Sequence, residues 1–156
     1  MIGGDRESKM AGLSSRSAVA IHALAMLAHR RGGSLTSAEI ADSLESNPVL
    51  VRRILGHLRD AHLVRSAEGR GGGWFLARTP RDITLYDAYA AVEGGRILSR
   101  HPHPPSGACA IGRNIGDLLD VEFRGAERAL EERLGRTTIA ALLQQILACD
   151  SEAQDH

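Results

Sequence analysis

Apolar residues recur at intervals of three and four along most of this chain, a spacing that is typical of amphipathic helices. The first predicted helix covers residues 15–29 and stops at RRGG (30–33), where a glycine suits a left-handed C-cap. Residues 1–12 show no such periodicity, and we expect a disordered tail there. The face of the first helix that we expect to be buried consists of Ala18, Ile21, Ala25 and Ala28, widened by Leu24 and Leu27.

Two helix start signals lie close together and predict a short helix, a tight turn and a longer helix. The short helix, at 36–44, opens with a capping box made by Thr36 and Glu39. The longer helix, at 47–61, opens with Asn47 followed by a proline. This order is the helix-turn-helix pattern. The longer helix is expected to bury Val51, Ile54, Leu55 and Leu58 and to leave Arg52, Arg53, His57 and Arg59 on its other faces.

Two short segments after this helix alternate between apolar and polar residues. HLVRSA (62–67) and WFLAR (74–78) are predicted strands, and the glycine-rich EGRGGG between them is a predicted turn. The turn is not a nucleotide-binding loop, because its spacing fits neither phosphate-binding motif and a strand, rather than a helix, follows it. The longer helix at 47–61 corresponds to the recognition helix of a helix-turn-helix, and a hairpin directly after it predicts a winged helix. We expect Trp74 to pack this hairpin, the wing, onto the helices.

Three further helices are predicted after the hairpin. They cover residues 84–95, capped by Thr84, then 114–134, and last a stretch that starts at Thr137, with a proline-rich loop at 101–112. The longest helix has more apolar surface than a small winged helix can cover. We therefore expect it to pair with a second subunit, and burial against its own domain is the alternative. The expected dimer interface comprises Ile115, Leu118, Leu119, Phe123, Ala126 and Leu130.

These elements define the expected fold class, which is mainly α with a small β-hairpin wing. A winged helix-turn-helix is joined to a long dimerisation helix, and 156 residues suffice for one such domain with an extension. The expected domains are a tail at 1–12, a DNA-binding domain at 13–81, a helical dimerisation and sensing region at 82–148, and a tail at 149–156.

The net charge of zero conceals a difference between the two halves of the chain. Residues 1–81 contain 12 Lys and Arg against 7 Asp and Glu, a balance of +5, whereas residues 82–156 contain 7 against 12, a balance of −5. Residues 46–81 carry seven of the arginines, with only Asp60 and Glu68 as acids. A basic first half favours a polyanionic partner, although arginines in such numbers also occur on ordinary solvated faces.

The number of cysteines and the apolar run at 18–28 indicate the cellular location of the protein. Two cysteines are too few for a secreted domain held together by disulfides. The run AVAIHALAMLA is too short to span a bilayer, is interrupted by His22 and is closed by two arginines. We therefore expect a cytoplasmic protein that does not enter a membrane.

The winged helix places several side chains where such folds contact double-stranded DNA. The N-terminal end of the recognition helix enters the major groove, where an arginine can bond a guanine through two donors. Arg70, at the glycine-rich tip, suits a phosphate or a narrow minor groove. Helix-turn-helix dimers bind paired half-sites, so the operator should be near-palindromic. The predicted DNA-binding residues are Ser15, Arg16, Ser37, Asn47, Val49, Arg52, Arg53, His57 and Arg70, of which Ser15, Arg16 and Ser37 would anchor phosphates at helix starts.

Three segments in this order resemble one protein family. LSSRSAVAIHALAMLA, SNPVLVRRILGHLRDAHLVRSAEGRGGGWFLAR and ITLYDAYAAVEG are together similar to the Rrf-two family of bacterial transcriptional regulators, over residues 13–147. The resemblance implies a homodimer with an N-terminal winged helix and a long dimerisation helix. We accordingly expect a sequence-specific regulator of transcription, most simply a repressor, and not an enzyme.

The resemblance also bears on cofactors. The best-known relatives hold an iron–sulfur cluster with three cysteines that lie between the helix after the wing and the long helix, and this chain has only Cys109 there. One thiolate cannot hold such a cluster. His101 and His103 lie in a proline-rich loop, where histidines are more often solvated than bound to metal. We therefore expect no cofactor and no metal, and place the chain in a cluster-free branch of the family.

Cys109 is the candidate redox sensor, because it lies in a loop where Arg113 could favour its thiolate. Its oxidised form would be a sulfenic acid or a disulfide with Cys149, which requires Cα atoms within about 7 Å. The alternative is that Cys109 is an incidental small residue. Two rival functions are a winged-helix module that acts through a protein partner or a small-molecule effector, and a thiol enzyme, for which no Cys–His–acid arrangement is visible.

Overall fold

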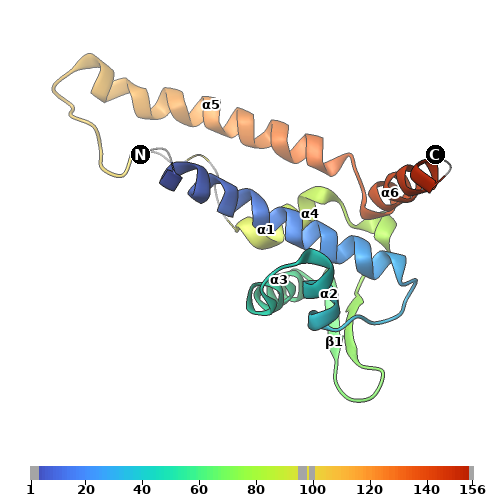
Figure 1. Cartoon of the computed structure of the whole chain (residues 1–156). Coiled ribbons are helices and arrows are strands. Elements are labelled where there is room, and N and C mark those ends of the chain that lie inside the picture. Colours follow the sequence, from blue (N-terminus) through green and yellow to red (C-terminus); the bar gives the residue numbers. More distant parts are fainter. Residues whose placement is uncertain (1–3, 95–97, 99–100, 155–156) are drawn as a thin grey trace. The chain divides into compact units, whose positions relative to one another are not determined.

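The computed structural model describes the backbone of residues 4–94, 98 and 101–154, and side chains from Ser15 onward. This part of the chain consists of helices and one two-stranded antiparallel sheet (Figure 1), which confirms the predicted fold class. The chain forms two compact units, one of which covers 95–134 while the other combines the chain up to Gly94 with the chain from Gly135 onward. The elements are α1 (Gly4–His29), α2 (Ser37–Leu44), α3 (Pro48–Asp60), β1 (Val64–Ala67), β2 (Gly73–Leu76), the 3-10 turn η1 (Pro80–Asp82), α4 (Leu85–Glu93), α5 (Ala110–Gly135) and α6 (Ile139–Gln154).

Helix α1 packs against α3, α4 and α6 and forms the centre of the first unit. Ala20, Ala23 and Leu24 are fully buried, whereas Ala18 is exposed and Ile21 is half-buried. The buried face of α1 is therefore rotated about the helix axis relative to the predicted face, so that Ala18 and Ile21 lie outside it. An alanine-rich helix gives the apolar periodicity little contrast, and small side chains let neighbours approach from several sides. The predicted residues that are buried are Leu24, Ala25, Leu27 and Ala28.

Helices α2 and α3 begin at the capping residues that the sequence predicts. The Glu39 N–H donates to Thr36 Oγ1 at 3.1 Å, and the Thr36 N–H donates to Glu39 Oε2 at 2.8 Å. In α3, Asn47 Oδ1 accepts from the Val49 N–H at 2.8 Å. These caps satisfy donors that the first turn of a helix leaves unpaired. The buried stripe of α3 is the predicted one, Val51, Ile54, Leu55 and Leu58.

The hairpin of β1 and β2 is the wing, and it extends away from the helices of its unit (Figure 1). It is tied to the segment before α2, because the Leu35 N–H donates to Trp74 O at 3.1 Å and the Trp74 N–H donates to Leu35 O at 2.8 Å. Trp74 is half-buried against the core, as the sequence predicts. The wing is thus held at its base by a third extended segment.

The glycines of the wing are required mainly by the chain's own backbone. A Cβ at Gly72 would lie 2.4 Å from Ala67 O, and one at Gly73, where φ is +131°, would lie 2.8 Å from Leu35 O. Gly71, with φ +74°, has open space around it and supplies the left-handed turn. The sequence predicted a turn at these glycines, and the structure adds close packing within the wing as a separate reason for them.

A short antiparallel bridge attaches α6 to the start of α4. The Leu85 N–H donates to Thr137 O at 2.9 Å, and the Ile139 N–H donates to Ile83 O at 2.8 Å. Ile83 and Ile139 are fully buried. Helices α4 and α6 consequently belong to the same compact unit as the winged helix, so the compact units do not divide at residue 82. The predicted division of roles between DNA binding and dimerisation stays a prediction.

The ends of the described chain are more helical than the sequence suggests. Helix α1 begins at Gly4 and α6 continues to Gln154, so both enter stretches that we predicted as tails, 1–12 and 149–156. Both stretches lack proline and contain several good helix formers, which extend a helix even without an apolar stripe. No helix within residues 4–94 and 101–154 combines the length and apolar composition that crossing a bilayer requires.

Candidate DNA-binding site

The N-terminal half of α3 presents polar and basic side chains to solvent, because its apolar stripe is buried. Asn47, Arg52 and Arg53 are exposed, and Val49 is 56% exposed although it is a large hydrophobic residue. A valine in this position suits the methyl group of a thymine, and an arginine suits the edge of a guanine. The fold thus brings four of the predicted residues together at one helix end, with His57 exposed one turn further on.

The arginines of α3 differ in whether the chain already pairs them. Arg59 Nη2 lies 3.5 Å from Asp60 Oδ1, whereas Arg52 and Arg53 have no ion pair or hydrogen bond to any residue that the structure describes. An unpaired guanidinium can bond a phosphate or a base edge without first losing a partner. Arg52 and Arg53 are therefore the basic groups of α3 that are best prepared for nucleic acid.

The arginines of the wing and its flanks also differ in whether the chain already pairs them. Arg65 stands directly opposite Phe75 in the hairpin and lies over its ring, with Cζ 4.4 Å from the ring centre, a cation–π contact. Arg78 Nε donates to His62 O at 3.4 Å. Arg70, at the exposed tip, has no such partner within the described residues. The pairing of Arg65 with Phe75 was not predicted, although the register of the hairpin places the two residues opposite each other.

The predicted phosphate anchors at helix starts lie differently from expectation. Because α1 begins at Gly4, Ser15 and Arg16 lie inside this helix, where the backbone amides are used by the helix itself. Their proposed role as anchors at a helix start is therefore wrong in its geometry, although Ser15 is exposed and Arg16 is half-buried. Ser37 is the first residue of α2, as predicted.

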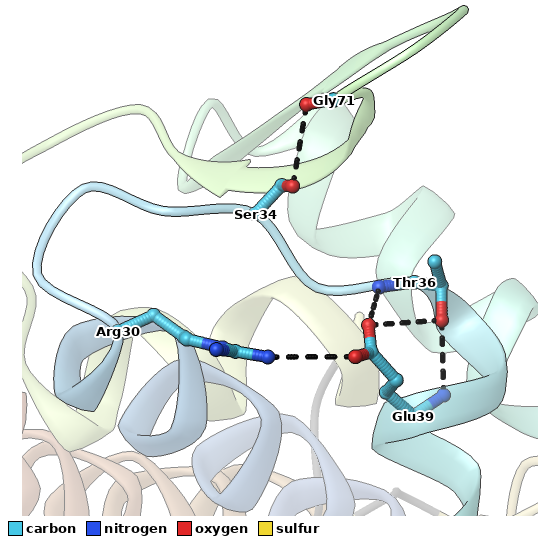
Figure 2. Close-up of polar contacts among 5 residues, drawn as sticks. All are labelled: Arg30, Ser34, Thr36, Glu39 and Gly71. Carbon is cyan, nitrogen blue, oxygen red and sulfur yellow. Dashed lines mark hydrogen bonds and ion pairs between the residues drawn. The ribbon is translucent and has the colours of Figure 1, made fainter.

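A network of polar contacts fixes the segment between α1 and α2, next to the wing (Figure 2). Arg30 Nη2 lies 3.4 Å from Glu39 Oε1, and Ser34 Oγ donates to Gly71 O at 3.3 Å. The hydrogen bonds from the backbone and the side chain of Thr36 hold the pKa of Glu39 below its usual range. Arg30, Glu39 and Thr36 thus link the end of α1 to the start of α2, and the separate bond from Ser34 links the intervening segment to the wing tip. The sequence showed only the capping box.

The two cysteines are both exposed and unbridged. Cys109 stands just before α5, and its Sγ accepts a hydrogen bond from the Gly112 N–H at 3.1 Å. Arg113, which we expected beside the thiol, donates instead to Gly107 O at 2.9 Å. The Cys109 sulfur is therefore hydrogen-bonded to the backbone at the start of α5, and the guanidinium of Arg113 is bonded elsewhere.

The donor set around Cys109 does not fit a metal cluster. Among the described residues, no three His, Cys, Asp or Glu side chains gather closely enough to share a metal ion. His101 and His103 are exposed. Iron–sulfur clusters need several thiolates, and one cysteine in this loop does not supply them.

A winged helix with unpaired arginines on its recognition helix and wing defines a class, the winged-helix DNA-binding regulators. Comparison with known proteins specifies the family: residues 13–145 match the Rrf2 family, described as "Iron-dependent Transcriptional regulator". The chain belongs to this family, which confirms the resemblance seen in the sequence. Because these family members are transcriptional regulators, the protein is not an enzyme.

Relatives support the same assignment. YwnA of Bacillus subtilis, described as an HTH-type transcriptional regulator, is 34% identical over 135 residues, which cover 86% of this chain and 98% of YwnA. A crystal structure of a transcriptional regulator from Lactobacillus plantarum has a TM-score of 0.70 at 26% identity, over 90% of this chain and 98% of that one. The structure of CymR, the global cysteine regulator of B. subtilis, has a TM-score of 0.62 at 22% identity, over 83% and 94%, and shows the common fold.

Proposed function

We propose that this protein is a homodimeric, cluster-free transcriptional repressor that binds a near-palindromic operator. One observation carries the proposal: the unpaired arginines Arg52 and Arg53, the exposed Val49 and the wing arginine Arg70 all belong to one winged-helix unit. Family membership supports DNA binding and regulation of transcription.

On DNA, the N-terminal half of α3 would enter the major groove. Arg52 would bond a guanine through two donors, and Val49 would contact a thymine methyl group. Arg70 would bind the backbone beside the groove, because the glycine-rich tip approaches it closely. Base contacts would supply the specificity, and the wing would supply affinity and register.

Two subunits would pair through α5. Within the chain, Ile115, Leu119, Phe123 and Leu130 of the predicted interface are only half-buried, and Leu118 is 67% exposed. A helix of 26 residues with this much uncovered apolar surface favours a partner helix. A two-fold dimer would place two recognition helices on consecutive half-sites.

The signal in this proposal is oxidation of Cys109. Its thiolate would attack one oxygen of hydrogen peroxide, forming an S–O bond and breaking the O–O bond. Sulfur is then oxidised to the sulfenic acid while peroxide is reduced to water. A second thiol, such as Cys149 of either subunit, could displace water from the sulfenic acid and form a disulfide.

The experiment is selection and sequencing of DNA fragments by the purified protein, followed by sedimentation of the complex. We expect an inverted repeat bound by two chains. A Phe123→Glu variant places a charge between the two α5 helices of the proposed dimer. It should sediment as a monomer and lose most of its affinity for the operator. Selection of no common sequence would contradict the proposal, and so would a monomer that binds the operator as tightly as the parent.

A further inference from the structure

The connection between α1 and α2 contains an arginine in an unusual backbone conformation. Helix α1 ends at His29, and Arg31 follows with φ +50°. Residues other than glycine seldom adopt this left-handed region, because the Cβ atom crowds the backbone there. The next residue, Gly32, has φ +86° and adopts it without strain. Arg31 therefore occupies its position at a conformational cost, and an outlier of this kind points to a function for the side chain.

The side chain of Arg31 has no partner within the described chain. Its neighbour Arg30 lies 3.4 Å from Glu39 Oε1. Arg31 is exposed, and its side chain makes no hydrogen bond or ion pair to any residue that the structure describes. Basic residues at the end of a helix also stabilise the helix dipole, but Arg30 already supplies that charge to α1. The guanidinium of Arg31 is thus available to an anion.

The segment that carries Arg31 is fixed beside the wing. Figure 2 shows its two anchors, the pair of Arg30 with Glu39 and the hydrogen bond from Ser34 Oγ to Gly71 O at 3.3 Å. Arg31 precedes Ser34 by three residues, so their Cα atoms are at most about 11 Å apart. The wing arginine at position 70 directly precedes Gly71. One contact therefore joins two segments that each carry an unpaired arginine.

The surroundings of this contact are poor in acidic residues. From residue 8 to residue 38 the chain contains no Asp or Glu, and the next acid, Glu39, is already paired. Residues 61–81 contain Glu68 as their only acid, against four arginines. A surface with this charge attracts a polyanion. The wing is assigned to the DNA backbone, so DNA is the polyanion that lies within reach of Arg31.

We propose that Arg31 binds a phosphate of the DNA that flanks the operator, outside the stretch that α3 and the wing contact. The proposal rests on the DNA binding proposed above and adds a separate contact to it. A phosphate contact carries no sequence preference, so the flanking DNA adds affinity without adding specificity. The fragment that the protein binds with full affinity is consequently longer than the sequence that it recognises.

The test compares two duplexes with the full-length protein. One duplex is the selected inverted repeat alone, and the other has about ten base pairs, one turn of DNA, of arbitrary sequence added at each end. At about 50 mM salt, the parent should bind the longer duplex at least about fivefold more tightly. Arg31→Gly should bind the short duplex like the parent and lose the gain from the flanks. Its salt dependence on the longer duplex should fall by about one phosphate contact per subunit.

Two further variants separate the charge of Arg31 from its backbone conformation. Arg31→Lys should keep most of the gain from the flanks, because a phosphate accepts a lysine as a point charge. His62→Gly is the matched control, since His62 is also exposed and has φ +59°, and it should leave that gain unchanged. Arg31→Gly should melt no lower than the parent, because relief of the left-handed residue offsets the extra freedom of glycine in the unfolded chain.

Several results would overturn this contact. The first is equal affinity of the parent for both duplexes, and the second is an Arg31→Gly variant that keeps the gain from the flanks. Equal losses of that variant on the short and the long duplex would place Arg31 inside the recognised sequence. A lower melting temperature together with weaker binding to both duplexes would make Arg31 a structural residue of α1. A parent that selects no operator would refute the proposed function, and this contact with it.

Discussion

At the scale of single residues, exposed arginines differ in whether another group in the chain already holds them. Arg59 is paired with Asp60, and Arg65 lies over Phe75. Arg52 is exposed and has no partner among the described residues. Formal charge alone does not show this difference, because all three side chains carry the same charge. The paired arginines contribute to local structure, and the unpaired ones are available to a ligand.

Arg52→Ala should weaken binding to the preferred operator by about 1–3 kcal/mol and relax sequence preference at one position, because it removes a base contact. Arg70→Ala should weaken binding to all sequences alike and reduce the salt dependence, because it removes a backbone contact. Titration of operator and non-operator DNA at several salt concentrations measures both effects. Arg59→Ala is the control and should bind like the parent. If all three variants bind alike, our placement of α3 on DNA is wrong.

Glu39 gives a prediction of pH dependence. Its pKa is lowered from 4.5 by the Thr36 hydrogen bonds, so the carboxylate form stabilises the fold. This stability is fully present above the ordinary pKa and is lost as the pH falls through the lowered pKa. Glu39→Gln should therefore lower the melting temperature at pH 7, and the difference from the parent should shrink in acid. Asp42→Asn, on the same helix, is the control for the loss of one carboxylate, because the side chain of Asp42 has no hydrogen bond or ion pair to any described residue.

At the scale of elements, the wing depends on a contact that is distant in sequence. Leu35, in the segment before α2, pairs with Trp74 at the edge of β2. The same segment donates from Ser34 to the wing tip at Gly71. The wing is consequently fixed relative to α2, and with it the position of Arg70 relative to the recognition helix.

Gly73→Ala should disturb this contact, because φ is +131° and the new Cβ would lie 2.8 Å from Leu35 O. We expect a loss of about 1–3 kcal/mol in the free energy of unfolding, the range typical of such backbone strain. Chemical denaturation measures it. The control is Gly125→Ala in α5, where nothing lies within 4 Å of the new Cβ, and we expect a gain of up to about 1 kcal/mol there. Equal stability of both variants would argue against the wing anchor.

At the scale of the whole molecule, the proposed signal and the proposed dimer meet at one place in the chain. Cys109 stands immediately before α5, the helix that we assign to the dimer, and Gly112 donates to its sulfur. A modified sulfur could not accept this hydrogen bond in the same way. Oxidation would therefore act where the long helix begins, and through it on the spacing of the two DNA-reading units.

Mild peroxide should change the operator affinity of the parent and leave Cys109→Ser unchanged. We expect a change of at least about fivefold, as in typical allosteric coupling, measured by fluorescence anisotropy with labelled operator. Both cysteines are exposed, so Cys149→Ser is a necessary comparison. A variant that lacks only Cys149 and still responds would indicate a sulfenic acid, and loss of the response would indicate a disulfide. An equal response in Cys109→Ser would refute the thiol switch.

The sequence alone predicted the features that depend on neighbours along the chain. The capping box at Thr36, the caps at Thr84 and Asn47, and the hairpin were confirmed. Each of these signals is complete within a few residues, since a cap or a turn needs only its own side chains and backbone. The buried stripe of α3 was predictable for a similar reason, because this helix has one strongly apolar face.

The tertiary structure decided the features that depend on which elements meet. Two backbone contacts, the pairing of Leu35 with Trp74 and the bridge from α6 to α4, join segments that lie far apart in the sequence. The buried face of α1 likewise depends on which distant helices pack against it. The apolar groove between α1 and α6, lined by residues such as Ile21, Met26 and Leu143, was not predicted, because a groove exists only once both helices are placed. Periodicity limits which residues can be buried, and the packing of neighbouring elements determines which of them are.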